Sequence, residues 1–493
     1  MRVLGKAGDE IHILAMQNEE IHRGDYLLLE DQSKELRLVV QAYDETYLDI
    51  PGLSEEILRD EVIGISMQGI EEDPMDVRNI SFLIRDSRVL KCKMRGMISD
   101  SRLKPASTLL PSRVHTRVRK LSLNELFTLV DRKGGRAIEI GYGGKDPIEI
   151  FAESLDGRIN IVTGKKESGK SYLSKLLAGS LVKLGASLIV FDLNDEYKGL
   201  AVNKNGTPSS LSERTIRLEP GRSMKFDLKD LGLRAICNVL QNALDLPGAS
   251  MREFIRIWKS LVDHDSLNSE SLGNALVAAR TNEFVRDALI ARYHTLRSTG
   301  LLSDGPETIR LEEIVGQSGG GVLILISLAR LPPLTRKIAV ELVLSKLVDL
   351  LEFEKIRPIF LFAEEAHLYL RETYWDDIVT RMRHFGIFTT FITNQPDAIS
   401  HGIYRQCDNV FLFNFTNDAD IELVSKAAMV DAETVKSIVR TLPPRSCLVL
   451  GRVVADLPIV VQVNESEWNS MGETKLFFRD AFQDHEKEIQ ASR

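Results

Sequence analysis

The sequence predicts an α/β core built on a mainly parallel sheet, with a small β-rich domain before it and a helical insertion within it. An apolar strand at residues 160–163 leads directly into a glycine-containing loop and an apolar helix at 172–184. A second apolar strand follows that helix at 187–192. Strand, loop, helix and strand in this order place the two strands parallel, joined by a right-handed crossover.

Length and charge limit the class of protein. A chain of 493 residues has room for about two to four domains. Its 43% apolar and 27% charged residues are typical of a globular protein with a large core. The net charge of −8 excludes a uniformly basic nucleic-acid coat and disfavours broad adsorption to membranes. Local clusters of positive charge could still bind nucleic acid.

The cysteines and the apolar runs indicate a cytoplasmic protein. Cys92, Cys237, Cys407 and Cys447 lie far apart, so no pair has the spacing of a CxxC metal or redox motif. Scattered thiols suit a reducing compartment. The first residues lead into polar sequence without the apolar core of a signal peptide. The longest apolar run, residues 322–329, is too short to cross a bilayer, so we expect no membrane association.

Residues 1–110 are expected to form a small β-barrel or sandwich, because short β-like runs alternate there with polar turns. These runs lie at 11–14, 26–29, 36–40, 62–67 and 89–93. Residues 85–120 carry eleven lysines and arginines against two acids, Asp86 and Asp100. This basic segment is either a nucleic-acid or partner surface, or a solvated face that pairs with the acidic N-terminal segment.

The predicted core has two parts, residues 111–228 and 316–465, with a helical insertion at 229–315 between them and a tail at 466–493. Helical spacing in the insertion is clearest in an amphipathic piece at 251–258. Further core strands are expected at 137–142, 148–150, 321–326, 358–362, 387–393, 410–413, 447–450 and 459–463. Helices are expected at 334–354, after the start signal Pro332-Pro333, and at 375–384.

The loop at 164–171 reads Gly-Lys-Lys-Glu-Ser-Gly-Lys-Ser, which fits the phosphate-binding pattern G-x-x-x-x-G-K-[ST]. Glycines let backbone N–H groups curl around a phosphate chain, and the helix start adds a positive dipole. We expect Lys170 to reach the β- and γ-phosphates of ATP and Ser171 to give its hydroxyl to Mg²⁺. The expected nucleotide contacts are Gly164, Lys165, Lys166, Glu167, Ser168, Gly169, Lys170, Ser171 and Tyr172. Of these, Lys165, Lys166 and Glu167 should be exposed.

Two acids, Glu364 and Glu365, end an apolar run that begins at Pro358. Nucleotide hydrolysis needs a carboxylate on the metal side and a group that positions or deprotonates water. We expect Glu364 to contact Mg²⁺ through water and Glu365 to polarise the attacking water. The alternative is a strand end that is acidic by chance.

Three further polar residues follow strand ends at the same predicted edge. Gln395 comes after the strand at 387–393, where an amide can sense the γ-phosphate, or it is a turn residue before proline. Asp192 and Glu196 follow the strand at 187–192, on the edge where parallel sheets bind ligands. They would support the metal or the water, or they are ordinary helix-capping acids.

Arg381 and Arg383 lie on the helix predicted at 375–384. An arginine that stabilises transition-state charge is often supplied by a neighbouring subunit, so either residue is a candidate. The alternative for both is plain surface charge. His367, two positions after the acids, is better explained as a structural residue than as a ligand.

These motifs resemble the HerA family of the HerA/FtsK superfamily. The resemblance rests on Glu-Glu-Ala-His at 364–367, Arg-His-Phe-Gly at 383–386, Gln395-Pro396 and Asp-Leu-Asn-Asp-Glu-Tyr at 192–197. The N-terminal region is more weakly similar to the family's HAS-barrel domain. The chain departs from the family pattern in the loop residues 165–168 and in the spacing around Arg381. It also has Asp195 where a glycine is common. The chain is therefore identified as a divergent member.

The resemblance implies a RecA-like core and a homo-hexamer that uses ATP and Mg²⁺ to translocate on, or unwind, double-stranded DNA. It also implies a nuclease partner such as NurA, or another effector, in DNA end processing or defence. By position, Lys170 and Ser171 would bind nucleotide and Mg²⁺. Glu364 and Glu365 would be the Walker B acids. Gln395 would be the γ-phosphate sensor, and Arg383 rather than Arg381 the arginine that acts in trans.

Two other functions stay open from the sequence. A ring could use ATP to organise an effector enzyme without sustained translocation. A peptide-handling ATPase is also conceivable, although the HerA-like motifs count against it. Basic loops that face a channel would favour translocation, and the candidates are Arg214, Arg217, Arg222 and Lys225.

Overall fold

The computed structural model describes residues 1–16, 19–47, 87–105, 110–132, 134–316, 320–369, 383–427, 430–469 and 471. The chain divides into two compact units. The first unit takes its residues from Met1–Phe151, Gly164–Ser168 and Asp408–Val463. The second takes them from Ala152–Thr163, Gly169–Cys407 and Asn464–Arg493. No helix in the described ranges combines the length and apolarity that a membrane crossing requires.

The N-terminal sheet of the first unit is antiparallel and has the order β1-β2-β5-β4-β3-β7, with β6 paired to β5. Its strands are β1 Arg2–Ala7, β2 Glu10–Ala15, β3 Tyr26–Asp31, β4 Leu36–Tyr47, β5 Arg88–Ser99, β6 Arg102–Lys104 and β7 Thr116–Leu121. Alternate residues of β2 and β3, such as Ile11, Ile13, Leu27 and Leu29, are buried in one apolar cluster. This alternation is what a sheet with one covered face requires.

The predicted barrel is confirmed as an antiparallel sheet but not as a closed one. The predicted strands at 11–14, 26–29, 36–40 and 89–93 fall within β2, β3, β4 and β5, and the run at 62–67 lies outside the described residues. Within the part of the chain that the structure describes, no ladder joins β1 to β7, the two ends of the sheet order. Closure depends on pairing between distant strands, which local patterns do not specify.

The first unit also contains a set of antiparallel strands in the order β16-β17-β18-β8-β9. These strands are β8 Ala137–Gly143, β9 Asp146–Phe151, β16 Asn409–Phe413, β17 Ser446–Gly451 and β18 Ile459–Val463. The helices of this unit are α3 Leu123–Leu129, α13 Asp418–Ala427 and α14 Ala432–Val439, with a 3-10 turn η7 at Arg452–Val454. The prediction of a mainly parallel core is therefore wrong for this part, because an apolar run gives a strand but not its direction.

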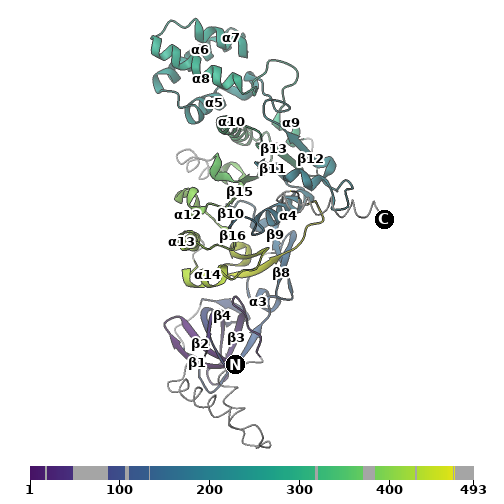
Figure 1. Cartoon of the computed structure of the whole chain (residues 1–493), viewed down its shortest axis with the longest axis vertical. Coiled ribbons are helices and arrows are strands. Elements are labelled where there is room, and N and C mark those ends of the chain that lie inside the picture. The colour runs from purple at the N-terminus through teal and green to yellow at the C-terminus, as the bar shows by residue number, and fades with distance from the viewer. Residues whose placement is uncertain are drawn as a thin grey trace, which may run out of the picture. The chain divides into compact units, whose positions relative to one another are not determined.

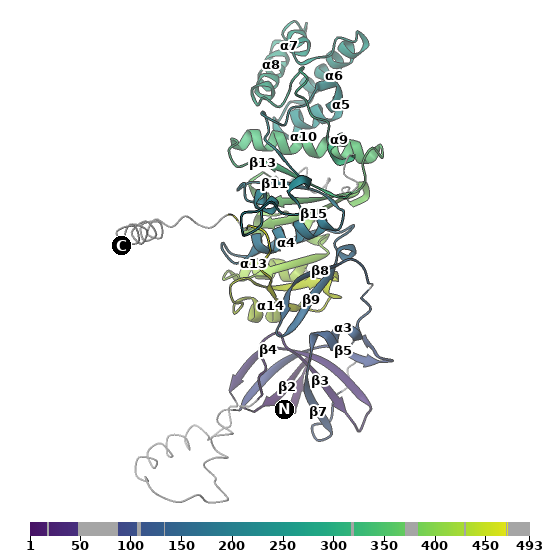
Figure 2. The same cartoon turned by 90° about the vertical axis from the view of Figure 1, so that its right-hand side faces the viewer.

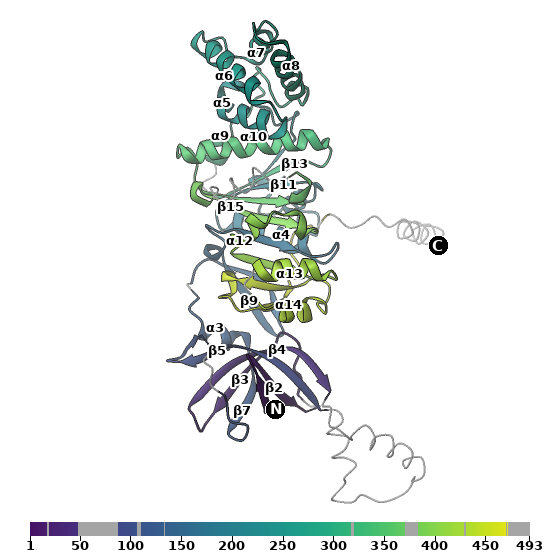
Figure 3. The same cartoon turned by 90° about the vertical axis from the view of Figure 1, so that its left-hand side faces the viewer.

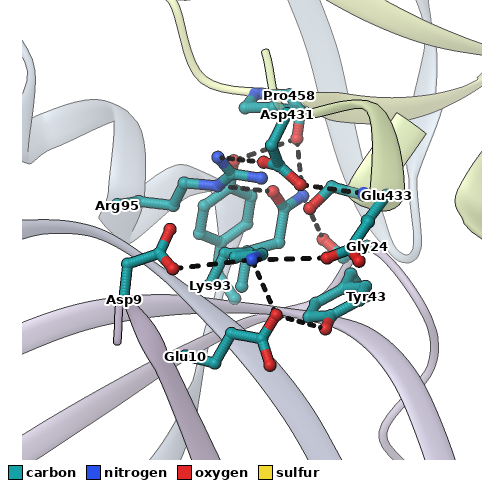
Figure 4. A network of polar contacts seen from close by, with 12 residues as sticks. Asp9, Glu10, Gly24, Tyr43, Lys93, Arg95, Asp431, Glu433 and Pro458 are labelled. Atoms are coloured by element: carbon teal, nitrogen blue, oxygen red, sulfur yellow. Dashed lines mark hydrogen bonds and ion pairs between the residues drawn. The ribbon is translucent and has the colours of Figure 1, made fainter. Parts of the chain in front are cut away.

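A polar network within the first unit ties the N-terminal sheet to α14 (Figure 4). Arg95 of β5 lies 3.3 Å from one carboxylate oxygen of Asp431. The other oxygen of Asp431 accepts a backbone N–H and caps α14. Lys93 of β5 lies 2.7 Å from Glu10 and 3.5 Å from Glu433. A polar network whose members are hydrogen-bonded or paired holds the elements that contribute to it, here β5 and α14, in one arrangement.

The basic segment at 85–120 is extensively paired with acids. Arg88 lies 2.6 Å from Glu45, and Lys91 lies 3.3 Å from Asp44. Together with Lys93, which pairs with Glu10, these residues agree with the interpretation of a face that pairs with the acidic N-terminal segment. They do not form a bare surface for nucleic acid.

The second unit contains a parallel sheet with the order β12-β13-β11-β14-β15-β10, in which every neighbouring pair is parallel. Its strands are β10 Asn160–Thr163, β11 Ser187–Asp192, β12 Thr215–Leu218, β13 Val322–Ser327, β14 Ile359–Glu364 and β15 Ile387–Thr393. The predicted core strands at 160–163, 187–192 and 387–393 match three of these without a shift. Buried parallel strands are continuous apolar runs, and this makes them easy to recognise.

The register of this sheet brings the polar strand ends to one edge. Asp192 of β11 pairs with Ser327 of β13, and Thr163 of β10 pairs with Thr393 of β15. Glu364, the last residue of β14, pairs with a residue of β15 just before that strand ends. Because ligands bind at the carboxyl edge of parallel sheets, this edge is the candidate site.

The helices of the second unit pack around and beyond this sheet. They are α4 Lys170–Lys183, α5 Leu228–Asn238, η4 Val239–Ala243, α6 Gly248–Asp263, α7 Ser269–Val277, α8 Glu283–Ser298, α9 Leu311–Gly316, α10 Pro333–Glu352 and α12 His401–Arg405. Short turns add η1 Ala152–Ser154, η2 Tyr197–Ala201, η3 Ser212–Arg214, η5 Ala366–Leu368 and η6 Pro396–Ala398. The long helix α10 lies beside β13 in all three views (Figures 1, 2 and 3).

Helices α6, α7 and α8 pack on one another as a small bundle (Figure 1), within the predicted helical insertion. Phe254, Ile257 and Trp258 of α6 are buried, as the amphipathic pattern at 251–258 predicted. The predicted helices at 172–184 and 334–354 correspond to α4 and α10. Most of the helix predicted at 375–384 lies outside the described residues.

Candidate active site

The first half of the phosphate loop, Gly164–Ser168, belongs to the first unit and is held by backbone hydrogen bonds. The Lys165 N–H donates to the carbonyl of Asn414 at 2.9 Å, and the Arg445 N–H donates to the carbonyl of Ser168 at 2.9 Å. A Cβ on Gly164 would lie 2.4 Å from the Cβ of Phe413, so no larger residue fits there without movement. As predicted, residues 165–167 are exposed.

The second half of the loop starts α4 in the second unit. Gly169 is the N-cap residue, with a φ of 118° that favours glycine. The N–H groups at a helix start and the helix dipole attract a phosphate. Lys170 is 7% exposed, and Ser171 and Tyr172 are half-buried. The local fold therefore presents the predicted phosphate-binding residues at a helix start.

Asp192 and Glu364 bury two carboxyl groups at the ends of β11 and β14. The side chains share a hydrogen bond, and the residues are only 1% and 2% exposed. Burial, followed by the charges of Asp192 and Glu196, raises the pKa of Glu364 well above its ordinary value. Burial also raises the pKa of Asp192. A pair that shares one proton is thus favoured where a cation would otherwise compensate the two charges.

Asp192 also organises the chain that follows it. Its carboxylate accepts the N–H of Glu196 at 3.1 Å and that of Tyr197 at 2.9 Å, at the start of η2. The capping role that was the alternative for Asp192 is therefore present. The same contacts leave Asp192 beside Glu364, so capping and metal support are compatible.

Glu365 follows the strand in a left-handed conformation with φ of 47°, which is uncommon for a residue other than glycine. Its Oε2 is buried and lies 3.5 Å from Nδ1 of His367, without hydrogen-bond geometry. The His367 ring bonds to Oγ1 of Thr393 at 3.0 Å. Burial lowers the pKa of His367, so the ring is held in its neutral form. His367 is a supporting residue, as the sequence suggested.

Gln395 and Arg383 are exposed. The Gln395 N–H donates to Oγ1 of Thr393 at 3.0 Å, which fixes its backbone and leaves the amide at the edge of the sheet. Arg383 makes no ion pair with any residue that the structure describes, and it precedes β15 by a few positions. The prediction for Arg381 lies outside the described residues.

One buried residue of the site was missed by the sequence analysis. Lys175 of α4 places its Nζ 2.8 Å from Oε2 of Glu196. The available signal was its spacing, because Lys175 follows Ser171 by four residues and so projects from the same helix face. Glu196 was predicted as a supporting acid, and this contact places it next to a buried cation.

The site has oxygen atoms suited to a hard cation. Among the described residues, Oε2 of Glu364, Oε2 of Glu365, Oγ1 of Thr163 and Oδ1 of Asn394 are buried without a hydrogen-bond partner. Magnesium prefers oxygen ligands and is usually held by one or two carboxylates together with phosphates and water. No cluster of three or more potential metal-binding side chains occurs in the described ranges. The unpartnered oxygen atoms fit a Mg²⁺ ion that arrives with a nucleotide.

The four candidate channel cations are engaged in local contacts of the second unit. Arg217 lies 3.0 Å from Asp195, and Lys225 lies 3.4 Å from Glu307. Arg222 pairs with Glu219, and Arg214 donates to the carbonyl of Gly320. These contacts reduce the positive charge that the segment can offer to DNA.

Comparison with known proteins gives one consistent picture. The family model "Helicase HerA, central domain" matches residues 162–348. The DNA double-strand break repair helicase HerA of Sulfolobus acidocaldarius is 21% identical over 479 residues, which cover 93% of this chain and 92% of that protein. Its counterpart in Saccharolobus solfataricus is 19% identical over 390 residues, 74% of this chain and 75% of that protein.

Solved structures share the fold. VirB4 of Thermoanaerobacter pseudethanolicus has a TM-score of 0.52 at 13% identity, covering 68% of this chain and 98% of that one. The bacterial conjugative coupling protein TrwB has a TM-score of 0.51 at 13% identity, covering 72% of this chain and 94% of that one. At this identity the likeness establishes an α/β P-loop fold and nothing more specific.

Proposed function

Because this chain is a divergent member of the HerA family of P-loop ATPases, we propose that its ATP hydrolysis drives movement along double-stranded DNA. The observation that supports this most strongly is the carboxyl edge of the parallel sheet. The helix start after the phosphate loop and the acids Asp192, Glu364 and Glu365 belong to neighbouring elements there. This is the set of groups that phosphoryl transfer to water requires.

Each residue then has a role in hydrolysis. The loop N–H groups and Lys170 bind the phosphates. Ser171, Glu364 and Asp192 would hold a Mg²⁺ ion, which would supply positive charge against the developing charge on the phosphate oxygens. The unpaired carboxylate oxygen of Glu365 orients and deprotonates the attacking water. Gln395 senses the γ-phosphate from the end of β15.

The assembly is a homo-hexamer in this proposal, with ATP at subunit interfaces. An exposed Arg383 without an ion pair to a described residue suits an arginine that completes the site of a neighbouring subunit. A nuclease such as NurA, or another effector, would use the movement in DNA end processing or defence. We propose four parts for this assembly. They are a barrel-like domain at 1–110, an ATPase core in two pieces at 111–228 and 316–465, an insertion at 229–315 and a tail at 466–493.

A second function is favoured by one observation. Three of the four candidate channel cations, Arg217, Arg222 and Lys225, pair with acids, and Arg214 donates to a backbone carbonyl. Most of the positive charge of this segment is therefore already compensated and is not offered to a DNA backbone. A ring that uses ATP to organise an effector, without sustained movement on DNA, needs no such charge.

ATP hydrolysis at fixed ionic strength, with and without linear double-stranded DNA, separates the two functions. Translocation predicts strong stimulation by DNA, abolished in Glu365→Gln and retained in the control Lys259→Ala, whose side chain is exposed on α6. Hydrolysis that is indifferent to DNA would contradict translocation and favour the assembly platform.

A further inference from the structure

Lys175 is a buried cation surrounded by polar and acidic groups of the second unit. Its side chain is 5% exposed, and its Nζ lies 2.8 Å from Oε2 of Glu196. The same ammonium donates to the carbonyl of Met471 at 3.0 Å and lies 5.9 Å from the centroid of the Tyr197 ring. Lysine is almost never buried unless it is paired, and here the pairing is specific.

The position of Lys175 on α4 connects it to the nucleotide end of the helix. Ser171 and Lys175 are four residues apart, so both side chains project from one helix face. Leu173 and Leu177 are also buried, but they project from the opposite side of the helix. Lys175 therefore lies on a separate buried face, the one that carries the hydroxyl expected to hold Mg²⁺.

Stability alone does not account for this ion pair. Burying two charges costs desolvation energy that their attraction only partly offsets, and an apolar replacement is often neutral or stabilising. The buried pair is therefore better explained by what it positions than by what it stabilises.

We propose that Lys175 is a positioning residue for ATP hydrolysis, and that its ammonium holds the Glu196 carboxylate at the acidic edge of the sheet. The contact fixes the spacing between α4, which carries Ser171, and the segment after β11. The N–H of Glu196 donates to Asp192, so the same contact also steadies the backbone that orients Asp192. Displacement of such groups by about 1 Å can lower a rate by about a hundredfold.

This inference rests on the proposed site of hydrolysis but not on DNA translocation. Its test therefore uses hydrolysis without DNA, measured as separate kcat and KM values. A second readout is equilibrium binding of ADP with Mg²⁺, and a third is the temperature of thermal unfolding. Whether DNA stimulates the enzyme is a separate experiment, so the failure of either idea can be recognised.

The variants isolate the charge of Lys175. Lys175→Met removes it at similar length, and Lys175→Arg keeps it. Lys183→Met is the matched control, because Lys183 lies on the same helix and pairs with Glu467 but is 39% exposed. Glu196→Gln and the double variant Lys175→Met/Glu196→Gln complete a double-mutant cycle, which measures whether the two residues act together.

We expect Lys175→Met to lower kcat by about tenfold or more. KM and ADP binding should change by less than about threefold. The unfolding temperature should fall, because removing one partner of a buried pair leaves the charge of Glu196 uncompensated, so rates are compared at a temperature where both proteins are folded. Lys175→Arg should recover part of the rate, and the double variant should be no slower than Glu196→Gln. Lys183→Met should match the wild type.

Three results would overturn the proposal. The first is a wild-type kcat in Lys175→Met, and the second is a loss of rate that multiplies with that of Glu196→Gln. The third is a loss of rate that merely follows a loss of folded protein. If Lys175→Met does not fold, the Glu196→Gln variant tests the proposal by itself. A wild-type kcat in Glu196→Gln would show that hydrolysis does not need the carboxylate that Lys175 is proposed to position, and would overturn the proposal.

Discussion

Asp192 and Glu364 end two adjacent parallel strands and share a hydrogen bond between buried carboxyl groups. One proton shared between them relieves the repulsion of two buried charges. The folded chain therefore holds a proton that the unfolded chain releases. Since the pKa of Glu364 is raised on folding, stability should fall as pH rises above the ordinary value of 4.5.

Glu364→Gln should abolish this penalty in the nucleotide-free protein. We expect the variant to be more stable than the wild type by about 1–3 kcal/mol at about pH 8, with a smaller difference near pH 5. It should also lose hydrolysis, because the amide is a poor magnesium ligand. Urea unfolding at the two pH values, without Mg²⁺, measures the difference. Parallel pH profiles for the two proteins would contradict the shared proton.

Gly164→Ala should impair nucleotide binding without unfolding the chain. The added Cβ would lie 2.4 Å from the Cβ of Phe413, so the loop must move away from its backbone partners. We expect ATP affinity to fall by about tenfold or more, equal to about 1.4 kcal/mol. Gly248→Ala is the matched control, because a Cβ added there would meet nothing within 4 Å. Calorimetric titration with ATP gives both values, and equal affinities would show that the loop tolerates the contact.

The contact between Arg95 and Asp431 predicts a graded effect on stability. Asp431→Asn keeps an oxygen that can cap α14 but weakens the ion pair, whereas Asp431→Ala removes both. We expect the alanine variant to lose about 1–2 kcal/mol and the asparagine variant clearly less. Chemical unfolding of the full chain measures the order. If both variants lose the same free energy, the cap contributes nothing measurable.

A site shared between subunits predicts recovery of activity on mixing. Arg383→Ala and Lys170→Ala should each lose hydrolysis, the first for want of the neighbour's arginine and the second for want of its own phosphate contact. In an equal mixture, about a quarter of random interfaces would combine an intact phosphate loop with an intact arginine. We expect a corresponding share of wild-type hydrolysis after subunit exchange. No recovery, despite mixed assemblies, would place Arg383 outside the neighbouring site.

The sequence was most informative where local pattern decides structure. Strands β10, β11 and β15 are buried on both faces, so each is a continuous apolar run that can be recognised without its neighbours. The phosphate loop and the paired acids at 364 and 365 were recognisable for the same reason, since their chemistry depends on adjacent residues. The structure places their elements along one sheet edge.

The relationships that were missed depend on distant pairing. Arg95 and Asp431 are 336 positions apart, and no local pattern relates them. The sequence shows that Lys175 lies in an apolar helix, but it does not show that the lysine pairs with Glu196, which lies beyond the next strand. The antiparallel direction of β8, β9 and β16–β18 likewise follows from chain connection and not from apolar runs. Charge counting over 85–120 could not show that its cations face acids on paired strands.

The most direct test of the central claim is displacement of a third strand from a linear DNA triplex by the wild-type protein. A motor that moves along double-stranded DNA should strip the third strand with ATP and Mg²⁺. It should not do so with a non-hydrolysable analogue, or when Glu365→Gln replaces the wild type. Active hydrolysis without displacement would contradict translocation and leave the ATP-dependent assembly platform as the better account.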